Sequence, residues 1–216
     1  MSRRFLSLTA LAAAIACGFS PISLHAAGPI ILVLGPPGSG KTVNAQKISK
    51  RYHVPTISVA DLLKQSGGWG KAGSTKTLRA PVESGDLVSD EVSIGLLEQR
   101  FTKADVNKGF VLDGFPLTAK QAEYLENVSK QRGLGEPIVV HITVADSTAT
   151  QRMLKRGRSD DNPATIERRL SEYHAQAELV LKRYPKVVTV DSSGTPNEVW
   201  QRVEQGLNPI LPGPGR

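Results

Sequence analysis

The eight residues from Gly35 to Thr42, which read GPPGSGKT, restrict the possible folds of this chain more than any other segment. They follow a short apolar run at 30–34 and precede an amphipathic stretch at 41–52, so the motif joins a predicted strand to a predicted helix. The spacing GxxxxGK[ST] in that context is typical of a P-loop, whose glycines let successive backbone N–H groups turn toward phosphate oxygens. The sequence therefore predicts an α/β fold that binds a nucleoside triphosphate.

Two side chains of this motif and one distant carboxylate carry the expected phosphate chemistry. Lys41 can reach the β- and γ-phosphates, while Thr42 can bind Mg²⁺ or a phosphate oxygen. Asp113 follows the apolar run 110–112, where a neighbouring parallel strand would bring its carboxylate beside the P-loop to hold Mg²⁺. An Asp at a strand end is also common as a helix cap, but the P-loop favours the metal role. We expect ATP and Mg²⁺ as cofactors, with further contacts from Gly35, Pro36, Gly38, Ser39 and Gly40.

Apolar runs rich in β-branched residues alternate with longer amphipathic segments, a pattern typical of βαβ units. The predicted strands are 30–34, 56–58, 110–112, 138–144 and 187–190. The predicted helices are 41–52, 89–103, 119–131, 147–156, 164–184 and 197–206. This order predicts a doubly wound, five-stranded parallel sheet with helices on both faces.

Two further segments resemble those of a known enzyme family. The run GFVLDGFPLTAKQA at 109–122 is similar to the strand and nucleotide-binding loop of adenylate kinases and related nucleoside monophosphate kinases. The run RMLKRGRSDDNPATIERRLSEYH at 152–174 resembles their lid and its flanking helices. The resemblance covers nearly all of residues 30–206. It implies the reaction NTP + NMP ⇌ NDP + NDP, a small monophosphate-binding flap at about 59–88, and a lid at about 156–161 that is too short for a zinc-binding hairpin.

The resemblance also implies a role for individual residues. Four arginines would surround the triphosphate and the transferred phosphoryl group: Arg152, Arg156, Arg158 and Arg169. In the transition state that group carries charge on three equatorial oxygens, which guanidinium groups stabilise. Asp160 and Asp161 match the acidic pair that orients such lid arginines. The acceptor nucleotide would be bound by Asp61, Lys64, Gly114, Leu117 and Gln121, with Gln121 reading the adenine edge.

The acceptor side departs from the family pattern. Leu117 and Lys64 each stand where the family usually has an arginine that grips the acceptor phosphate, and Lys64 restores the charge without the planar fork. Beside a nucleoside monophosphate kinase, two alternatives therefore stay open: an exported ATP-binding protein with reduced or no phosphotransfer, and a P-loop kinase with a non-nucleotide acceptor. The P-loop also departs, because Thr42-Val43-Asn44 follows Lys41 where Gly-Thr-Gln is usual.

The first 26 residues have the features of an export signal, with Arg3 and Arg4 ahead of an apolar run at 5–16 and a small-residue cleavage site ending at Ala26. We expect a periplasmic protein. Alternatively, Cys17 at the end of that run is lipidated and anchors the protein to a membrane, or the start codon is misassigned and the protein is cytoplasmic. Cys17 is the single cysteine, which excludes intramolecular disulfides.

Length and composition predict one domain at 27–207 followed by a flexible Pro/Gly-rich tail at 208–216. The glycine-rich segment 67–74, GGWGKAGS, is expected to be a mobile part of the flap. The formal net charge is +7, and it falls to +5 without Arg3 and Arg4, a modest excess that a nucleotide site explains without nucleic acid. The expected partners are small nucleotides, and the family resemblance suggests a monomer.

Overall fold

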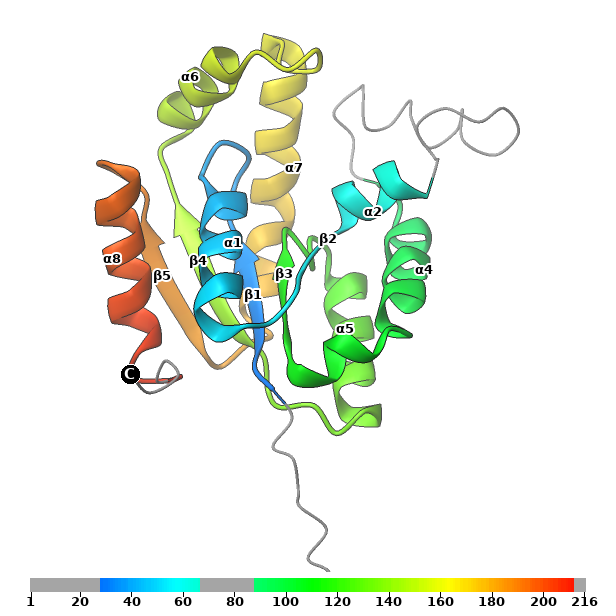
Figure 1. The fold of residues 1–216 in the computed structure, drawn as a ribbon. Helices are drawn as coiled ribbons and strands as arrows, with labels where there is room; N and C mark the ends of the chain where they lie inside the picture. Colours follow the sequence, from blue (N-terminus) through cyan, green and yellow to red (C-terminus); the bar gives the residue numbers. More distant parts are fainter. Residues whose placement is uncertain (1–27, 67–87, 212–216) are drawn as a thin grey trace, which may run out of the picture.

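A computed structural model, which describes residues 28–66 and 88–211, forms a five-stranded parallel sheet between two layers of helices (Figure 1). The sheet order is β2-β3-β1-β4-β5, with β1 at Ile30–Leu34, β2 at Thr56–Ser58, β3 at Phe110–Asp113, β4 at Ile138–Thr143 and β5 at Val187–Asp191. Every pairing is parallel. The fold class predicted from the sequence is confirmed, and each strand boundary agrees within one residue.

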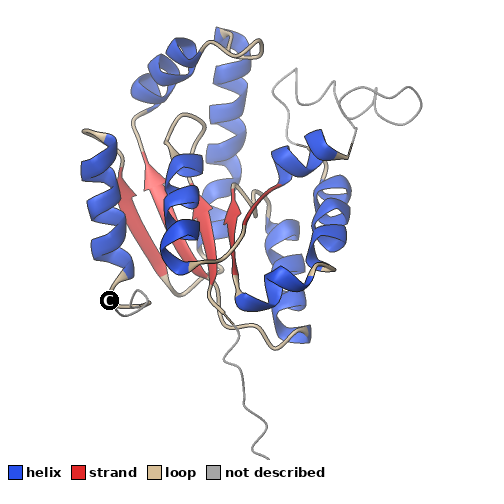
Figure 2. Cartoon of the chain, viewed as in Figure 1, coloured by secondary structure: helices blue, strands red, loops and turns tan. Residues whose placement is uncertain are grey.

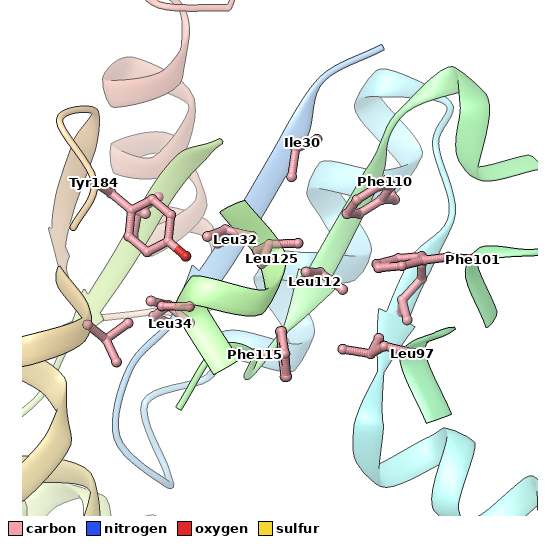
Figure 3. Close-up of a cluster of buried hydrophobic side chains, with 14 of the residues drawn as sticks. Ile30, Leu32, Leu34, Leu97, Phe101, Phe110, Leu112, Phe115, Leu125 and Tyr184 are labelled. Atoms are coloured by element: carbon pink, nitrogen blue, oxygen red, sulfur yellow. The ribbon is translucent and has the colours of Figure 1, made fainter. Parts of the chain in front are cut away.

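The central strand β1 is buried along its whole length, and its alternating side chains reach two separate cores. Ile30, Leu32 and Leu34 enter a core built with α4 (Asp90–Phe101), α5 (Ala119–Gln131) and α7 (Pro163–Leu181), as Figure 3 shows. Ile31 and Val33 face α1 (Lys41–Tyr52) and α8 (Pro196–Leu207) on the other side. A strand buried on both faces reads as a continuous apolar run, and that is the IILVL pattern observed.

Polar side chains cap the N-termini of four of the longer helices by accepting a hydrogen bond from a backbone N–H of the first turn. Ser89 is the N-cap of α4, Thr118 of α5, Asn162 of α7 and Thr195 of α8. The sequence places these helices correctly to within three residues at each end. It did not assign, by periodicity, the short α2 (Val59–Gln65) or the 3-10 helix η1 (Ala104–Lys108), since neither is long enough to establish a period.

The lid connection and the C-terminal end complete the described fold (Figure 2). Helix α6 (Asp146–Arg156) ends at Gly157 in a left-handed conformation, and α7 begins six residues later, so the connection between the two helices is short. The predicted flexible tail begins too early at 208, because the Tyr52 hydroxyl donates to the Leu211 carbonyl at 2.8 Å and Arg51 donates to Asn208 at 2.9 Å. No helix among the described residues is long and apolar enough to cross a membrane. The predicted export signal, the segment 67–74 and residues 212–216 lie outside the described residues.

Candidate functional site

The P-loop and Asp113 meet at the carboxyl ends of two neighbouring strands, where open α/β sheets bind ligands. Val33 of β1 pairs with Asp113 of β3, and the Gly114 N–H donates to the Val33 carbonyl at 3.0 Å. A cavity of about 680 Å³ opens above this edge of the sheet. Twelve of the predicted site residues line it: Gly35, Gly38, Lys41, Thr42, Lys64, Asp113, Gly114, Leu117, Gln121, Arg156, Arg158 and Arg169.

Two glycines of the P-loop are required by backbone conformation and by close approach. Gly38 has φ +81°, and a Cβ there would lie 2.7 Å from the carbonyl oxygen of Ala149. At Gly35 a Cβ would lie 2.4 Å from the carbonyl oxygen of Ile142. The loop therefore runs directly against the β4–α6 region, and only glycine fits at these two positions. The turn continues through Ser39, whose N–H donates to the Pro36 carbonyl at 3.1 Å, and Gly40 leads into α1.

Lys41 extends from the first turn of α1 across the mouth of the P-loop, where its Nζ donates to the Pro36 carbonyl at 3.4 Å. Burial lowers the pKa of the Lys41 ammonium. The carboxylate of Asp113 opposes this shift, and the charges of Arg156, Arg158 and Arg169 add to it. Four cations within reach of one another form a positive centre that favours a polyanion such as a triphosphate.

Asp113 is buried, with 8% of its surface exposed, and its Oδ1 has no hydrogen-bond partner. Burial raises the pKa of this carboxyl, while a hydrogen bond from Thr42 and the charge of Lys41 act in the opposite direction. A buried carboxylate oxygen without a partner is costly unless a ligand completes it. Within the described ranges 28–66 and 88–211, no group of three or more His, Cys, Asp or Glu side chains is arranged to hold a metal ion. One carboxylate and one hydroxyl beside a phosphate site nevertheless fit Mg²⁺, which takes few protein ligands.

Two of the lid arginines are held by the acidic pair that precedes α7. Arg156 donates to both carboxylate oxygens of Asp161, at 2.9 and 2.6 Å, and the Asp161 side chain is fully inaccessible to solvent. Arg169 forms an ion pair with Asp160 and lies 3.6 Å from Asp161. The Arg158 backbone N–H also donates to Asp161 at 3.1 Å. Asp160 and Asp161 in the short connection therefore fix arginines of both flanking helices that line the cavity.

Arg152 does not line the cavity with the other three predicted arginines. It donates to the Gly38 carbonyl at 3.4 Å, to the Ser192 hydroxyl at 2.9 Å and to the Ser192 carbonyl at 2.8 Å. Arg152 thus joins the P-loop to the segment that follows β5. In this arrangement it supports the loop, while its predicted contact with phosphate stays a prediction.

The acceptor side of the cavity carries little charge among the described residues. Lys64 at the end of α2 is exposed and lies 3.4 Å from the carboxylate of Asp61, which itself does not line the cavity. Leu117 and Gln121 also line the cavity, and the Leu117 N–H donates to Gln121 Oε1 at 2.7 Å. Lys64 and Leu117, which stand where the resembling family usually has arginine, therefore both line the cavity.

Several residues near the cavity were not singled out for function from the sequence. Asp90, read there only as part of an acidic helix start, accepts hydrogen bonds from Gln121 and Thr118. His141 of β4 bonds to the Tyr173 hydroxyl at 2.8 Å, and burial lowers the pKa of His141. No sequence signal marks these contacts, because each pair is about thirty residues apart in the chain.

A P-loop, a buried carboxylate beside it and an arginine-bearing connection over a shared cavity define a P-loop phosphotransferase. The sequence model described as adenylate kinase matches residues 33–189. An adenylate kinase of Mycobacteroides abscessus is 36% identical over 178 residues, which cover 82% of this chain and 98% of the relative. An adenylate kinase of Xanthomonas campestris pv. campestris is 38% identical over 186 residues, with the same shares covered. The chain belongs to the adenylate kinase family, whose homologues support nucleoside monophosphate kinase activity at the family level.

Proposed function

We propose that this protein is a Mg²⁺-dependent nucleoside monophosphate kinase that transfers the γ-phosphoryl group of ATP to AMP. The observation that supports this most directly is the single cavity shared by the P-loop, three arginines and Gln121. The P-loop and the cations suit a donor triphosphate, and the Gln121 amide suits an acceptor base.

The chemistry follows from the charges around the P-loop. An oxygen of the AMP phosphate attacks the γ-phosphorus, the bond from that phosphorus to the bridging oxygen breaks, and ADP leaves with the electron pair. The acceptor oxygen is already anionic, so no general base is needed. Lys41, Arg156, Arg158 and Arg169 stabilise the charge that spreads over the equatorial oxygens, and the surrounding protein excludes water as the lid closes.

Thr42 and Asp113 are the residues we propose to hold Mg²⁺. The unpartnered Oδ1 of Asp113 and the hydroxyl of Thr42 supply hard oxygen ligands or hydrogen bonds to metal-bound water. When bound, the ion neutralises phosphate charge. Arg152 is proposed to act from behind the loop by fixing the Gly38 carbonyl.

A kinase with a non-nucleotide acceptor is the second candidate, favoured by Leu117 and by the ion pair that occupies Lys64. A coupled assay with the purified mature protein, ATP, Mg²⁺ and a panel of monophosphates separates the two. Turnover with AMP supports the first proposal. Tight ATP binding without turnover of any monophosphate would refute it and would favour the alternatives, including an ATP-binding protein with little phosphotransfer.

We also propose that the protein is exported to the periplasm, on the basis of the pattern in residues 1–26. N-terminal sequencing of the native protein is expected to begin near Ala27. A blocked N-terminus at Cys17 would indicate lipid anchoring instead, and a cytoplasmic protein that retains Arg3 would contradict export.

A further inference from the structure

Two hydrogen bonds hold the side-chain amide of Gln121 in one orientation at the cavity. Its Oε1 accepts from the Leu117 N–H at 2.7 Å, and its Nε2 donates to Oδ1 of Asp90 at 2.9 Å. Gln121 is buried, with 2% of its surface exposed, yet it lines the cavity. Asp90 begins α4 and Gln121 lies in the first turn of α5, so their hydrogen bond joins two helices.

The two partners decide which end of the amide carries the oxygen. Ionised Asp90 offers only acceptors, and the Leu117 N–H is only a donor. Reversing the amide would set oxygen against carboxylate and N–H against N–H, so two hydrogen bonds would become two repulsive contacts. Thr118 donates to the same Asp90 oxygen at 2.9 Å, which holds the carboxylate itself in place.

The fixed amide keeps one N–H and one oxygen lone pair for a ligand. A 6-aminopurine presents a donor at its amino group beside an acceptor at N1. A 6-oxopurine presents the reverse order, an acceptor at O6 beside a donor at N1. An amide free to exchange its oxygen and nitrogen positions by rotation would match either base. A fixed amide matches one base and leaves the other with unpaired polar groups.

We propose that Asp90 is a positioning residue that determines base selectivity, because it locks the Gln121 amide in the order that matches a 6-aminopurine monophosphate. This inference rests on the proposed function, in which the acceptor is a purine nucleoside monophosphate. Asp90 acts through Gln121 and does not itself touch the substrate.

The test compares AMP with its 6-oxo counterpart IMP in the unmodified protein and in Asp90→Asn and Asp90→Ala. An Asn at position 90 can accept from or donate to Gln121, and an Ala does neither, so both variants leave the Leu117 N–H as the only partner that orients the amide. We expect the ratio of kcat/KM for AMP to that for IMP to fall at least about 10-fold. The change is expected in the KM for the acceptor, with the KM for ATP unchanged.

Glu91→Gln is the matched control. Glu91 is the next residue of α4 and pairs with Lys120 of α5 at 2.5 Å, so it also joins the two helices, but on the exposed surface. We expect this variant to keep the wild-type ratio. In a Gln121→Leu background, Asp90→Asn is expected to cause no further change in the ratio, because the residue through which it acts is gone.

Equilibrium dissociation constants for AMP and IMP, measured without ATP, separate this inference from the proposed function. Absence of turnover in the unmodified protein refutes the kinase proposal, while a lower AMP preference in binding by the Asp90 variants still supports the inference. An unchanged ratio in folded variants overturns it, as does an unmodified protein that treats AMP and IMP alike. An unmodified protein that binds neither nucleotide overturns both.

Discussion

Replacing Leu117 by arginine is expected to improve acceptor binding. Leu117 lines the cavity, and its N–H is engaged by Gln121 through the backbone, so the side chain can change without breaking that contact. An arginine there could form two charge-assisted hydrogen bonds to a phosphate, each contributing about 1.5 to 3 kcal/mol. Ordering the long side chain costs about 2 kcal/mol. The net gain of about 1 to 4 kcal/mol corresponds to a KM for AMP that is roughly 5- to 1,000-fold lower.

The assay is the coupled reaction with AMP varied at saturating ATP, for Leu117→Arg, Leu117→Lys and Leu117→Met. Lysine adds charge without the planar fork, so its gain is expected to be smaller, and methionine is the volume-matched apolar control that should change little. Raising the ionic strength should reduce the gain of the charged variants only. An unchanged or raised KM for AMP in Leu117→Arg, or an equal gain in Leu117→Met, would show that this residue does not face the acceptor phosphate.

Three further predictions concern the donor side. Gly38→Ala is expected to weaken ATP binding at least about 10-fold and to lower the free energy of unfolding by about 1 to 3 kcal/mol, because Gly38 has a positive φ and an added Cβ would lie 2.7 Å from a backbone oxygen. Urea unfolding and ATP titration measure the two effects. Gly135→Ala is the control, since an added Cβ there meets open space. Asp113→Asn is expected to reduce Mg²⁺-dependent turnover about 100-fold or more. Because it removes a buried charge, the same change is expected to stabilise the metal-free protein by about 1 kcal/mol. A lower free energy of chemical unfolding would contradict the predicted stabilisation. Burial alone would raise the pKa of Asp161, but hydrogen bonds from Arg156 and from the Arg158 backbone, with the nearby guanidinium charges, hold it below its ordinary value. The ionised Asp161 therefore contributes about 2 kcal/mol to the free energy of unfolding above pH ~4, and this contribution is lost as the pH falls through the lowered pKa. In thermal unfolding, Asp161→Asn should be less stable than the parent at neutral pH and should converge with it in acid.

The fold could be predicted almost completely from the sequence, because its signals are local. The strand 30–34 is continuous and apolar, the P-loop follows it at once, and N-cap residues such as Ser89 mark helix starts. The exceptions are short or terminal. Helix α2 has only seven residues, and the tail is held by Tyr52 and Arg51, which no composition argument could foresee.

The candidate site was predictable by residue type and only partly by position. Lys41, Asp113 and the lid arginines 156, 158 and 169 line one cavity. Arg152, which has the same residue type and lies four positions from Arg156, instead binds the P-loop carbonyl and Ser192. Helical spacing indicates which residues share a face, but which neighbour a guanidinium meets depends on the strand packed opposite.

By itself, the sequence determined the order of strands and helices, the P-loop conformation and the replacement of acceptor arginines by Leu117 and Lys64. Those properties depend on residues near in the chain, whose glycine torsions and apolar period act locally. The contact of Asp90 with Gln121, 31 residues away, and that of Arg152 with Ser192, 40 residues away, depend on how the folded layers pack. Such contacts form when packed layers bring distant polar groups together in places where water cannot satisfy them, so each group must bond to whatever the fold sets beside it.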